Sequence, residues 1–129
     1  MFSLDDFDKL RFLQGRWQGV SPDHKEFFEE YARPEPGVLH SRRYDSAAFT
    51  NAAEGATITW QDGEVLSRWN EFTWRAAEIH PDSATFTPVN APGTFVWQVV
   101  DEATLEATQR WNADGREHEY TLRLKRIGG

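Results

Sequence analysis

Hydrophobic and polar residues alternate with a period of two along most of the chain, from Arg16 to Ile127. This alternation is typical of β-strands with one buried face, because neighbouring side chains point to opposite sides of a strand. Short clusters of Gly, Pro, Asn, Asp and Ser interrupt it and mark turns. The turn signal near Asn70 is weak, so two of the predicted strands could be one. The pattern predicts strands over residues 16–21, 25–33, 38–45, 56–61, 64–69, 72–79, 84–88, 94–100, 104–111 and 117–127.

The start of the chain follows a helical period instead. Ser3 is a good N-cap residue, and Asp6 three positions later can complete a capping-box arrangement. Gly15 supplies the stop signal. The sequence therefore predicts a short helix over about residues 4–13 with a single apolar face. That face consists of Phe7, Leu10 and either Leu13 or Phe12.

Many short strands joined by tight turns favour an antiparallel sheet in which each strand pairs with the next. The sequence predicts an all-β fold, a single antiparallel up-and-down β-barrel of 8–10 strands over about residues 15–127, with a short N-terminal helix. All 129 residues fit one domain, and no linker divides them. A β-sandwich is the alternative left open. The longest connection, over residues 46–55, is either a loop or a lid.

Charge and composition narrow the range of partners. The chain has 21 acidic and 14 basic residues, a formal net charge of −7, and no cysteine. An acidic surface disfavours nucleic acid and anionic membranes, and the lack of cysteine excludes disulfides and thiolate zinc sites. No apolar run approaches the about 20 residues of a membrane span, and the acidic start lacks the features of a signal peptide. We therefore expect a cytoplasmic protein with no nucleic-acid partner and no membrane insertion.

The chain is rich in aromatic residues, with six Trp, nine Phe and three Tyr. In the later strands, alternation places large aromatic side chains and a few polar ones on the inner face. Ligand pockets combine apolar walls with a few polar groups in this way, whereas a packed core has no need of the polar groups. The predicted ligand-binding residues are Phe72, Trp74, Phe95, Trp97, Gln109, His118, Tyr120 and Arg42.

The early strands offer more than one candidate inner face. In the third strand we expect Val38, His40, Arg42 and Tyr44 to point inward. In the second strand two sets compete for the interior, and both contain aromatic side chains. These sets are Phe27, Glu29 and Tyr31 against Phe28, Glu30 and Ala32. The inner set of strand 72–79 extends from Phe72 toward Glu78.

The segment Leu13-Gln14-Gly15-Arg16-Trp17-Gln18-Gly19 resembles the opening Gly-x-Trp strand of the calycins, the lipocalin-like superfamily. The strands after it are similar in spacing to small bacterial lipocalin-like proteins of unknown function and, more distantly, to the nitrobindins. The resemblance implies that Trp17 lies at the closed end of a barrel, against a basic residue of the last strand. We expect Arg126 to be that residue and to stack on Trp17.

The leading hypothesis for function is a barrel that binds a small hydrophobic or amphipathic molecule. Similarity to the nitrobindins implies a second hypothesis, heme binding with His118 as axial ligand. Some lipocalin-like barrels are enzymes, and here Arg42, Tyr44, Glu29 and His118 would supply an anion clamp and a general acid or base. No catalytic motif is present, so we assign no catalytic residue, and apart from heme we expect no cofactor and no metal. A filled barrel that acts as a protein interaction module is the fourth hypothesis, and an exposed strand edge would allow a homodimer.

Overall fold

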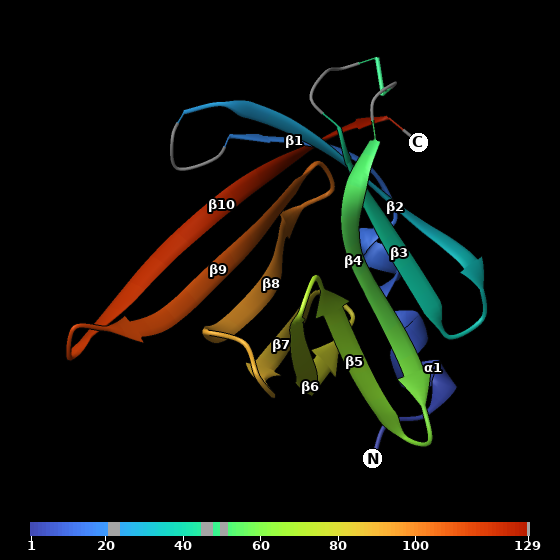
Figure 1. Ribbon diagram of the computed structural model, residues 1–129. Coiled ribbons are helices and arrows are strands. Elements are labelled where there is room, and N and C mark those ends of the chain that lie inside the picture. The colour runs from blue at the N-terminus through green and yellow to red at the C-terminus, as the bar shows by residue number, and fades with distance from the viewer. Residues whose placement is uncertain (21–23, 45–47, 50–51, 129) are drawn as a thin grey trace.

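Ten antiparallel strands close into one barrel in the computed structural model, which describes residues 1–20, 24–44, 48–49 and 52–128 (Figure 1). Each strand pairs with its neighbours in the sequence, and β1 pairs with β10 to complete the ring. The predicted up-and-down barrel is confirmed, and the β-sandwich is excluded. The strands are β1 (Gly15–Val20), β2 (Glu26–Glu35), β3 (Val38–Tyr44), β4 (Ala52–Gln61), β5 (Glu64–Trp69), β6 (Phe72–His80), β7 (Ser83–Pro88), β8 (Gly93–Asp101), β9 (Thr104–Ala113) and β10 (Arg116–Gly128).

Turns with left-handed backbone positions separate several of these strands. Asp62 and Gly63 join β4 to β5, Asp114 and Gly115 join β9 to β10, and all four residues have positive φ. Two consecutive positive φ values are typical of the type I′ turn, whose twist matches that of paired strands. Asn70, between β5 and β6, has a φ of 55°. The weak signal there marks a true turn, so two separate strands are present.

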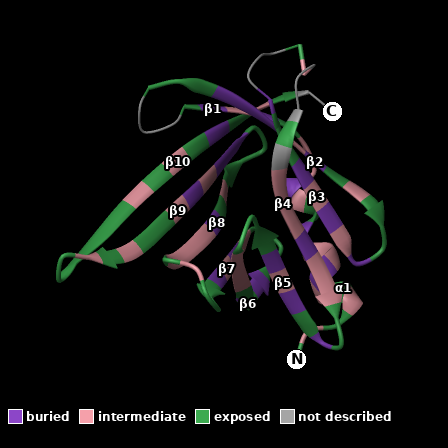
Figure 2. Ribbon diagram, viewed as in Figure 1, coloured by how far each residue is buried: buried purple, intermediate pink, exposed green. Residues whose placement is uncertain are grey.

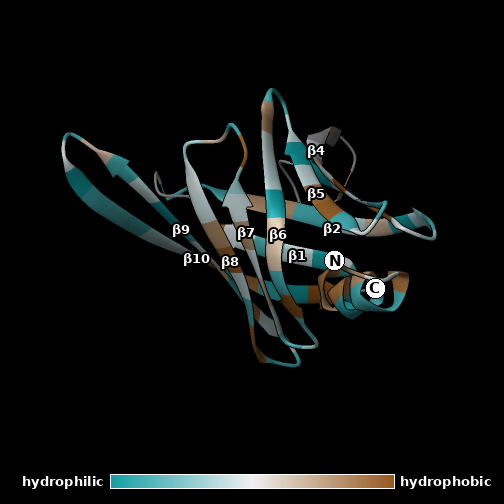
Figure 3. Ribbon diagram, turned by 90° about the horizontal axis from the view of Figure 1, so that it is seen from below, coloured by the Kyte–Doolittle hydropathy of each residue, from teal (hydrophilic) through white to brown (hydrophobic). Residues whose placement is uncertain are grey.

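Burial alternates along most strands, as a barrel with one solvated face requires (Figure 2). Hydropathy alternates along them too (Figure 3). The most deeply buried hydrophobic side chains come from several different strands, so the core is continuous through the barrel. They include Leu39, Ile58, Val65, Phe86 and Leu105, each at most 1% exposed.

The N-terminal segment begins as the α-helix α1 (Leu4–Asp8) and continues as the 3-10 helix η1 (Lys9–Leu13). The predicted capping box is present, because Ser3 and Asp6 each accept a hydrogen bond from the other's backbone N–H. The predicted helix therefore has the right span but changes type within it. Its apolar face, made of Phe7, Leu10 and Leu13, is buried in the core.

This helical segment crosses one end of the barrel (Figure 3). At its start, the Phe2 N–H donates to the Gly63 carbonyl at 2.7 Å, and the Trp60 indole N–H donates to the Phe2 carbonyl at 2.8 Å. Its other end meets β10 through Arg126. The segment is thus fixed both to the β4–β5 hairpin and to the last strand, and it closes the end between them.

A short seam between β1 and β10 completes the barrel. At its centre the Arg126 guanidinium carbon lies 4.2 Å from the centre of the Trp17 ring. Arg126 also donates to the carbonyls of Gln14, at 2.8 Å, and Phe12, at 3.4 Å. The Trp17 indole N–H donates to the Leu13 carbonyl at 2.9 Å. The predicted contact between Trp17 and Arg126 is present, and it joins the first strand, the last strand and the helical segment.

The β9–β10 hairpin reaches beyond its neighbouring strands (Figure 1). β8 begins at Gly93, opposite Trp111, so the residues of the hairpin beyond Trp111 have no partner in β8. On the other side, β10 pairs with β1 only from Lys125 onward within the described residues. Over its N-terminal half, β10 has β9 as its one described strand partner.

A bulge changes which residues of β6 face inward. The register between β6 and β7 shifts between Ala76 and Glu78, and beyond the shift Ile79 is buried while Glu78 is exposed. The expectation that Glu78 continues the inner set is wrong, because the extra residue of a bulge resets the alternation.

Two predicted connections lie partly outside the described residues. β4 begins at Ala52, so the loop or lid expected over residues 46–55 is shorter than predicted, and 46–47 and 50–51 are not described. The turn at 21–23 also lies outside the described residues. Among the residues that the structure does describe, no helix combines the length and apolar character needed to cross a membrane.

Replacing Arg126 by alanine should lower the free energy of unfolding by about 2–4 kcal/mol, because a cation–π contact and charged hydrogen bonds are lost. Urea denaturation followed by circular dichroism measures this change. Arg123→Ala is the matched control on the same strand. The Arg123 side chain is 62% exposed and pairs with Glu106, and such exposed pairs contribute at most about 1 kcal/mol. Equal losses in the two variants would contradict the role of the seam.

Candidate ligand cavity

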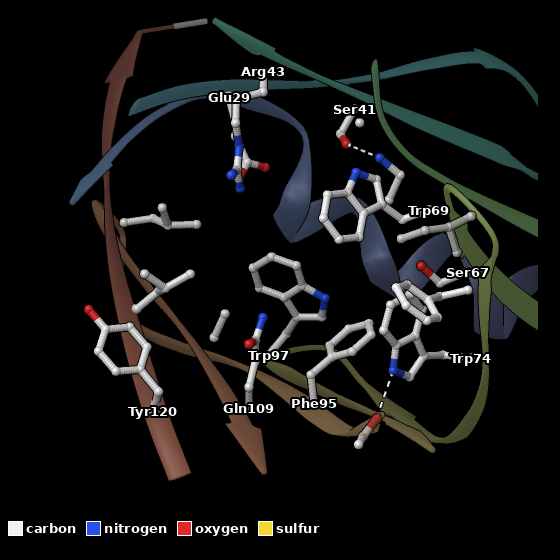
Figure 4. Close-up of a pocket in the computed structure, with 18 of the residues that line it drawn as sticks. Glu29, Ser41, Arg43, Ser67, Trp69, Trp74, Phe95, Trp97, Gln109 and Tyr120 are labelled. Atoms are coloured by element: carbon white, nitrogen blue, oxygen red, sulfur yellow. Dashed lines mark hydrogen bonds and ion pairs between the residues drawn. The ribbon is translucent and has the colours of Figure 1, made fainter. Parts of the chain in front are cut away.

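The barrel contains a cavity of about 690 Å³ (Figure 4). Pockets for small molecules measure about 300–1,000 Å³. The lining includes Trp69 and Phe72 beside the β5–β6 turn, and Gly93 at the start of β8. These positions lie at the end of the barrel away from the helical segment. Trp69 is 42% exposed, so the cavity meets solvent at this end.

A chain of aromatic side chains forms one wall of the cavity (Figure 4). Ring centres lie 6.1 Å apart for Phe72 and Trp74, and 5.3 Å apart for Trp74 and Phe95. They lie 6.0 Å apart both for Phe95 and Trp97 and for Trp97 and Tyr31. The planes of these pairs cross at angles from 60° to 88°, which suits the charge distribution of aromatic rings. The interlocked rings give the cavity a firm, largely apolar surface.

Two indole N–H groups in this wall differ in their partners. The Trp74 N–H donates to the Gly93 carbonyl at 2.8 Å, which fixes the ring to the start of β8. The Trp97 N–H is buried and has no hydrogen-bond partner among the described residues. A buried donor without an acceptor costs free energy, so no hydrogen bond of its own fixes the orientation of the Trp97 ring.

Four side chains from β2 and β3 form what we call the polar corner of the cavity: Glu29, Tyr31, Ser41 and Arg43. Arg43 Nη2 donates to Glu29 Oε1 at 2.7 Å. The Glu29 side chain is 10% exposed and that of Arg43 is 48% exposed. The Arg43 guanidinium carbon also lies 4.3 Å from the centre of the Phe27 ring. The corner thus holds a buried carboxylate whose cationic partner extends toward solvent.

A bulge in β4 lies opposite Ser41 of this corner. The register shifts between His40 and Arg42, and Ser41 Oγ accepts a hydrogen bond from the Ala56 N–H at 2.7 Å (Figure 4). Gly55 allows the two strands to approach, since a Cβ there would lie 2.4 Å from the Ser41 carbonyl oxygen. The serine hydroxyl therefore replaces a backbone partner where the ladder is interrupted.

Burial raises the pKa of the Tyr31 phenol well above its ordinary value of 10.0. The charge of Glu29 raises this pKa further, because it opposes a second negative charge nearby. A hydrogen bond with Ser41 and the charge of Arg43 act in the opposite direction and are smaller. Tyr31 therefore stays protonated at neutral pH, and its corner of the cavity disfavours an added negative charge.

Six of the eight predicted ligand-binding residues line the cavity. They are Phe72, Trp74, Phe95, Trp97, Gln109 and Tyr120. Gln109 is exposed and Tyr120 is half-buried, so these two lie where the cavity widens toward solvent. Arg42 and His118 are not part of the lining. Contact between the six residues and a ligand stays a prediction.

The predicted inner face of β3 is wrong. Ser41 and Arg43 line the cavity, whereas Arg42 is exposed on the other face. Tyr44 is buried, but its ring packs against Phe49, with centres 4.9 Å apart, and does not line the cavity. An aromatic cluster on the outer face covers Tyr44, so burial of this residue does not identify the inner face.

In β2 the structure selects Phe27, Glu29 and Tyr31, all of which line the cavity. Phe28 is buried as well, on the outer face, where its ring centre lies 5.9 Å from that of Phe49. Because both faces of β2 bury aromatic side chains, alternation alone could not distinguish the two sets.

His118 is exposed on the projecting part of the β9–β10 hairpin. Its ring stacks on Trp111, with centres 5.6 Å apart and planes at 17°. The expectation that His118 lies inside the barrel is wrong because His118 lies at the end of the barrel, level with the first residue of β8, and has no described strand on its β1 side. A side chain on the inner face there meets solvent and not a cavity wall.

Arg43 and Trp69 line the cavity but were not among the predicted ligand-binding residues. A signal for Trp69 was present, since the alternation Val65, Ser67, Trp69 puts all three on one face, and the first two are buried. Arg43 required the strand register, which places it directly opposite Glu29. That register depends on the turn between β2 and β3 and is not visible in either strand alone.

The lining does not fit heme in the predicted way. His118 lies outside it, and the lining contains no other histidine among the described residues. Tyrosine can ligate heme iron, and the described lining has two, Tyr31 and Tyr120. The raised pKa of Tyr31 opposes its phenolate form. Within the described part of the chain, no group of three or more His, Cys, Asp or Glu side chains is placed to hold a metal ion.

Comparison of the sequence with protein-family models finds no matching family, and comparison with curated proteins finds no match. A ten-stranded antiparallel up-and-down barrel with a short N-terminal helix is consistent with a calycin-like fold.

The unfolding free energy should fall as the pH rises above about 10, and it should fall less steeply in Tyr31→Phe. Because the pKa of Tyr31 is raised in the folded state, the unfolded chain releases the phenol proton first. The stability that Tyr31 contributes is therefore fully present below its unfolded pKa and is lost as the pH rises through its folded pKa. Urea titrations between pH 7 and pH 11 measure both slopes. Parallel curves above pH 10 would refute this assignment.

Proposed function

We propose that this protein binds a small hydrophobic or amphipathic molecule inside its barrel. The observation that carries the proposal is the cavity of about 690 Å³, which has a largely apolar lining with many aromatic side chains and is open to solvent near Trp69. Apolar burial and ring contacts supply affinity, and a few polar groups orient the ligand. A barrel that served only as a protein interaction module would need no such space.

A lipocalin-like relationship supports the same proposal. The opening Gly-x-Trp, the contact of Trp17 with Arg126 at the closed end, and the capped N-terminal helix all agree with that resemblance. The small bacterial lipocalin-like proteins that the chain resembles have no known function, so the resemblance implies no particular ligand. The chemical class of the ligand must therefore come from the cavity of this chain.

Binding without turnover is the form of the proposal that the geometry favours. The residues considered for catalysis are not brought together: Arg42 and His118 are exposed, and Tyr44 packs outside the cavity. Of the four, Glu29 alone lines the cavity, and it is paired with Arg43. We assign no catalytic residue.

Ala107→Phe tests the proposal with the neutral fluorescent probe N-phenyl-1-naphthylamine. Ala107 lines the cavity and is buried, so a phenyl ring there fills space that a ligand would occupy. The unchanged protein should bind one probe molecule per chain, and the variant should bind about tenfold more weakly or not at all. Thr108→Phe, the neighbouring position outside the lining, should bind as the unchanged protein does.

Circular dichroism of both variants controls for folding, and native mass spectrometry of the purified protein tests for a retained molecule. An unchanged protein that binds no probe, or an Ala107→Phe variant that binds it as tightly, would argue against a ligand in the barrel.

We also propose that the chain forms a homodimer through the edge of β10. Over residues 116–124, β10 has no strand partner on the β1 side within the described residues. An unpaired strand edge offers backbone N–H and C=O groups to a second strand. Light scattering after gel filtration should then give a mass near twice 14.9 kDa that falls on dilution. A single-chain mass at every concentration would rule the dimer out.

A further inference from the structure

The polar corner places opposite charges beside one another in an otherwise apolar cavity. Glu29 and Arg43 point into the cavity from β2 and β3, across from Trp97 and Gln109 (Figure 4). The hydrogen bond of 2.7 Å between them uses one of the five N–H donors of a guanidinium and one of the two oxygens of the carboxylate. The corner is therefore close to neutral overall and has both donors and acceptors to offer.

A ligand head that carries a charge would meet both members of this pair. An anionic head attracted by Arg43 also lies near the carboxylate of Glu29, and a cationic head attracted by Glu29 lies near the guanidinium. Either head also loses hydration on entering the cavity, and the closely paired charges do not restore it. A neutral head pays far less for the loss of water. It can accept from the guanidinium while donating to the carboxylate.

The pKa of Tyr31 indicates how unfavourable an added negative charge is in the polar corner. Its phenol belongs to the same corner, and both burial and Glu29 shift its titration against the anionic form. The opposing effects of Arg43 and Ser41 are smaller. A carboxylate of a ligand placed beside Tyr31 would meet the same environment as a phenolate there.

We propose that the cavity selects ligands with an aromatic or alkyl body and a neutral hydrogen-bonding head, such as a hydroxyl or a carboxamide, and discriminates against the matching carboxylates. The head lies at the Glu29–Arg43 pair, and the body lies along Trp97, Phe95 and Trp74. This inference rests on the proposed function, because it requires that a small molecule occupies the barrel.

Two ligands of nearly identical shape test the inference: 2-(2-naphthyl)acetamide, which is neutral, and the carboxylate anion of 2-naphthylacetic acid. Each is titrated at pH 7.5 against the protein loaded with N-phenyl-1-naphthylamine, and displacement of the probe gives its affinity. We expect the amide to bind about tenfold more tightly than the carboxylate. This comparison uses the unchanged protein and so does not depend on how any variant folds.

Glu29→Gln then identifies the residue that sets the preference. The variant keeps the shape of the side chain but leaves Arg43 without an anionic partner, so the carboxylate should bind about tenfold more tightly than before, while the amide changes little. Glu30→Gln is the matched control. Glu30 is the next residue of β2, points away from the cavity and pairs with Arg16 at 2.8 Å, so both affinities should stay unchanged.

The outcomes separate this inference from the proposed function. If the probe binds and the carboxylate displaces it as well as the amide does, the head-group preference is wrong while ligand binding stands. The same conclusion follows if neither naphthyl ligand displaces a bound probe, or if Glu29→Gln folds and leaves the ratio of affinities unchanged. If the probe itself does not bind, both proposals fail.

Discussion

The contact between Arg126 and Trp17 is the interaction on which the barrel depends. A sheet of ten strands has two edges, and only their pairing turns it into a closed wall. Here the pairing is short, and one arginine adds a ring contact and two carbonyl hydrogen bonds to it. Because those carbonyls belong to the segment that crosses the end of the barrel, the same side chain fixes both the closure of the wall and the position of the plug.

The plug and the seam together decide where the interior is filled. Phe7, Leu10 and Leu13 occupy the end beside the seam and belong to the same buried core as Leu105. Toward the other end the strands continue without a plug, and the interior becomes the cavity. The barrel thus has a packed core at one end and a cavity at the other, with the aromatic wall running between them.

Much of the fold could be predicted from the sequence because its signals are local. Period-two alternation and the turns at Asp62-Gly63 and Asp114-Gly115 are properties of adjacent residues, and all ten strands follow from such signals. The errors have non-local causes. The β6 bulge that exposes Glu78 depends on the partner strand, and the exposure of His118 depends on where β8 begins. Arg42 was placed inside because it shares a face with Tyr44, which is buried by Phe49 outside the cavity. The pairing of Glu29 with Arg43 follows only from the register of β2 against β3.

The seam also determines when the barrel can exist. Arg126 reaches back to Gln14 across 112 positions of the chain, while every other strand pair joins neighbours in the sequence. During synthesis, the first nine strands can therefore pair one after another as hairpins. They form an open sheet whose edge strands, β1 and β9, each have one unpaired side. The entropy of joining such distant segments is lost only in the last step. Until β10 is synthesised, the unpaired edges of the sheet can pair with strands of other chains, and the wall of the cavity is incomplete.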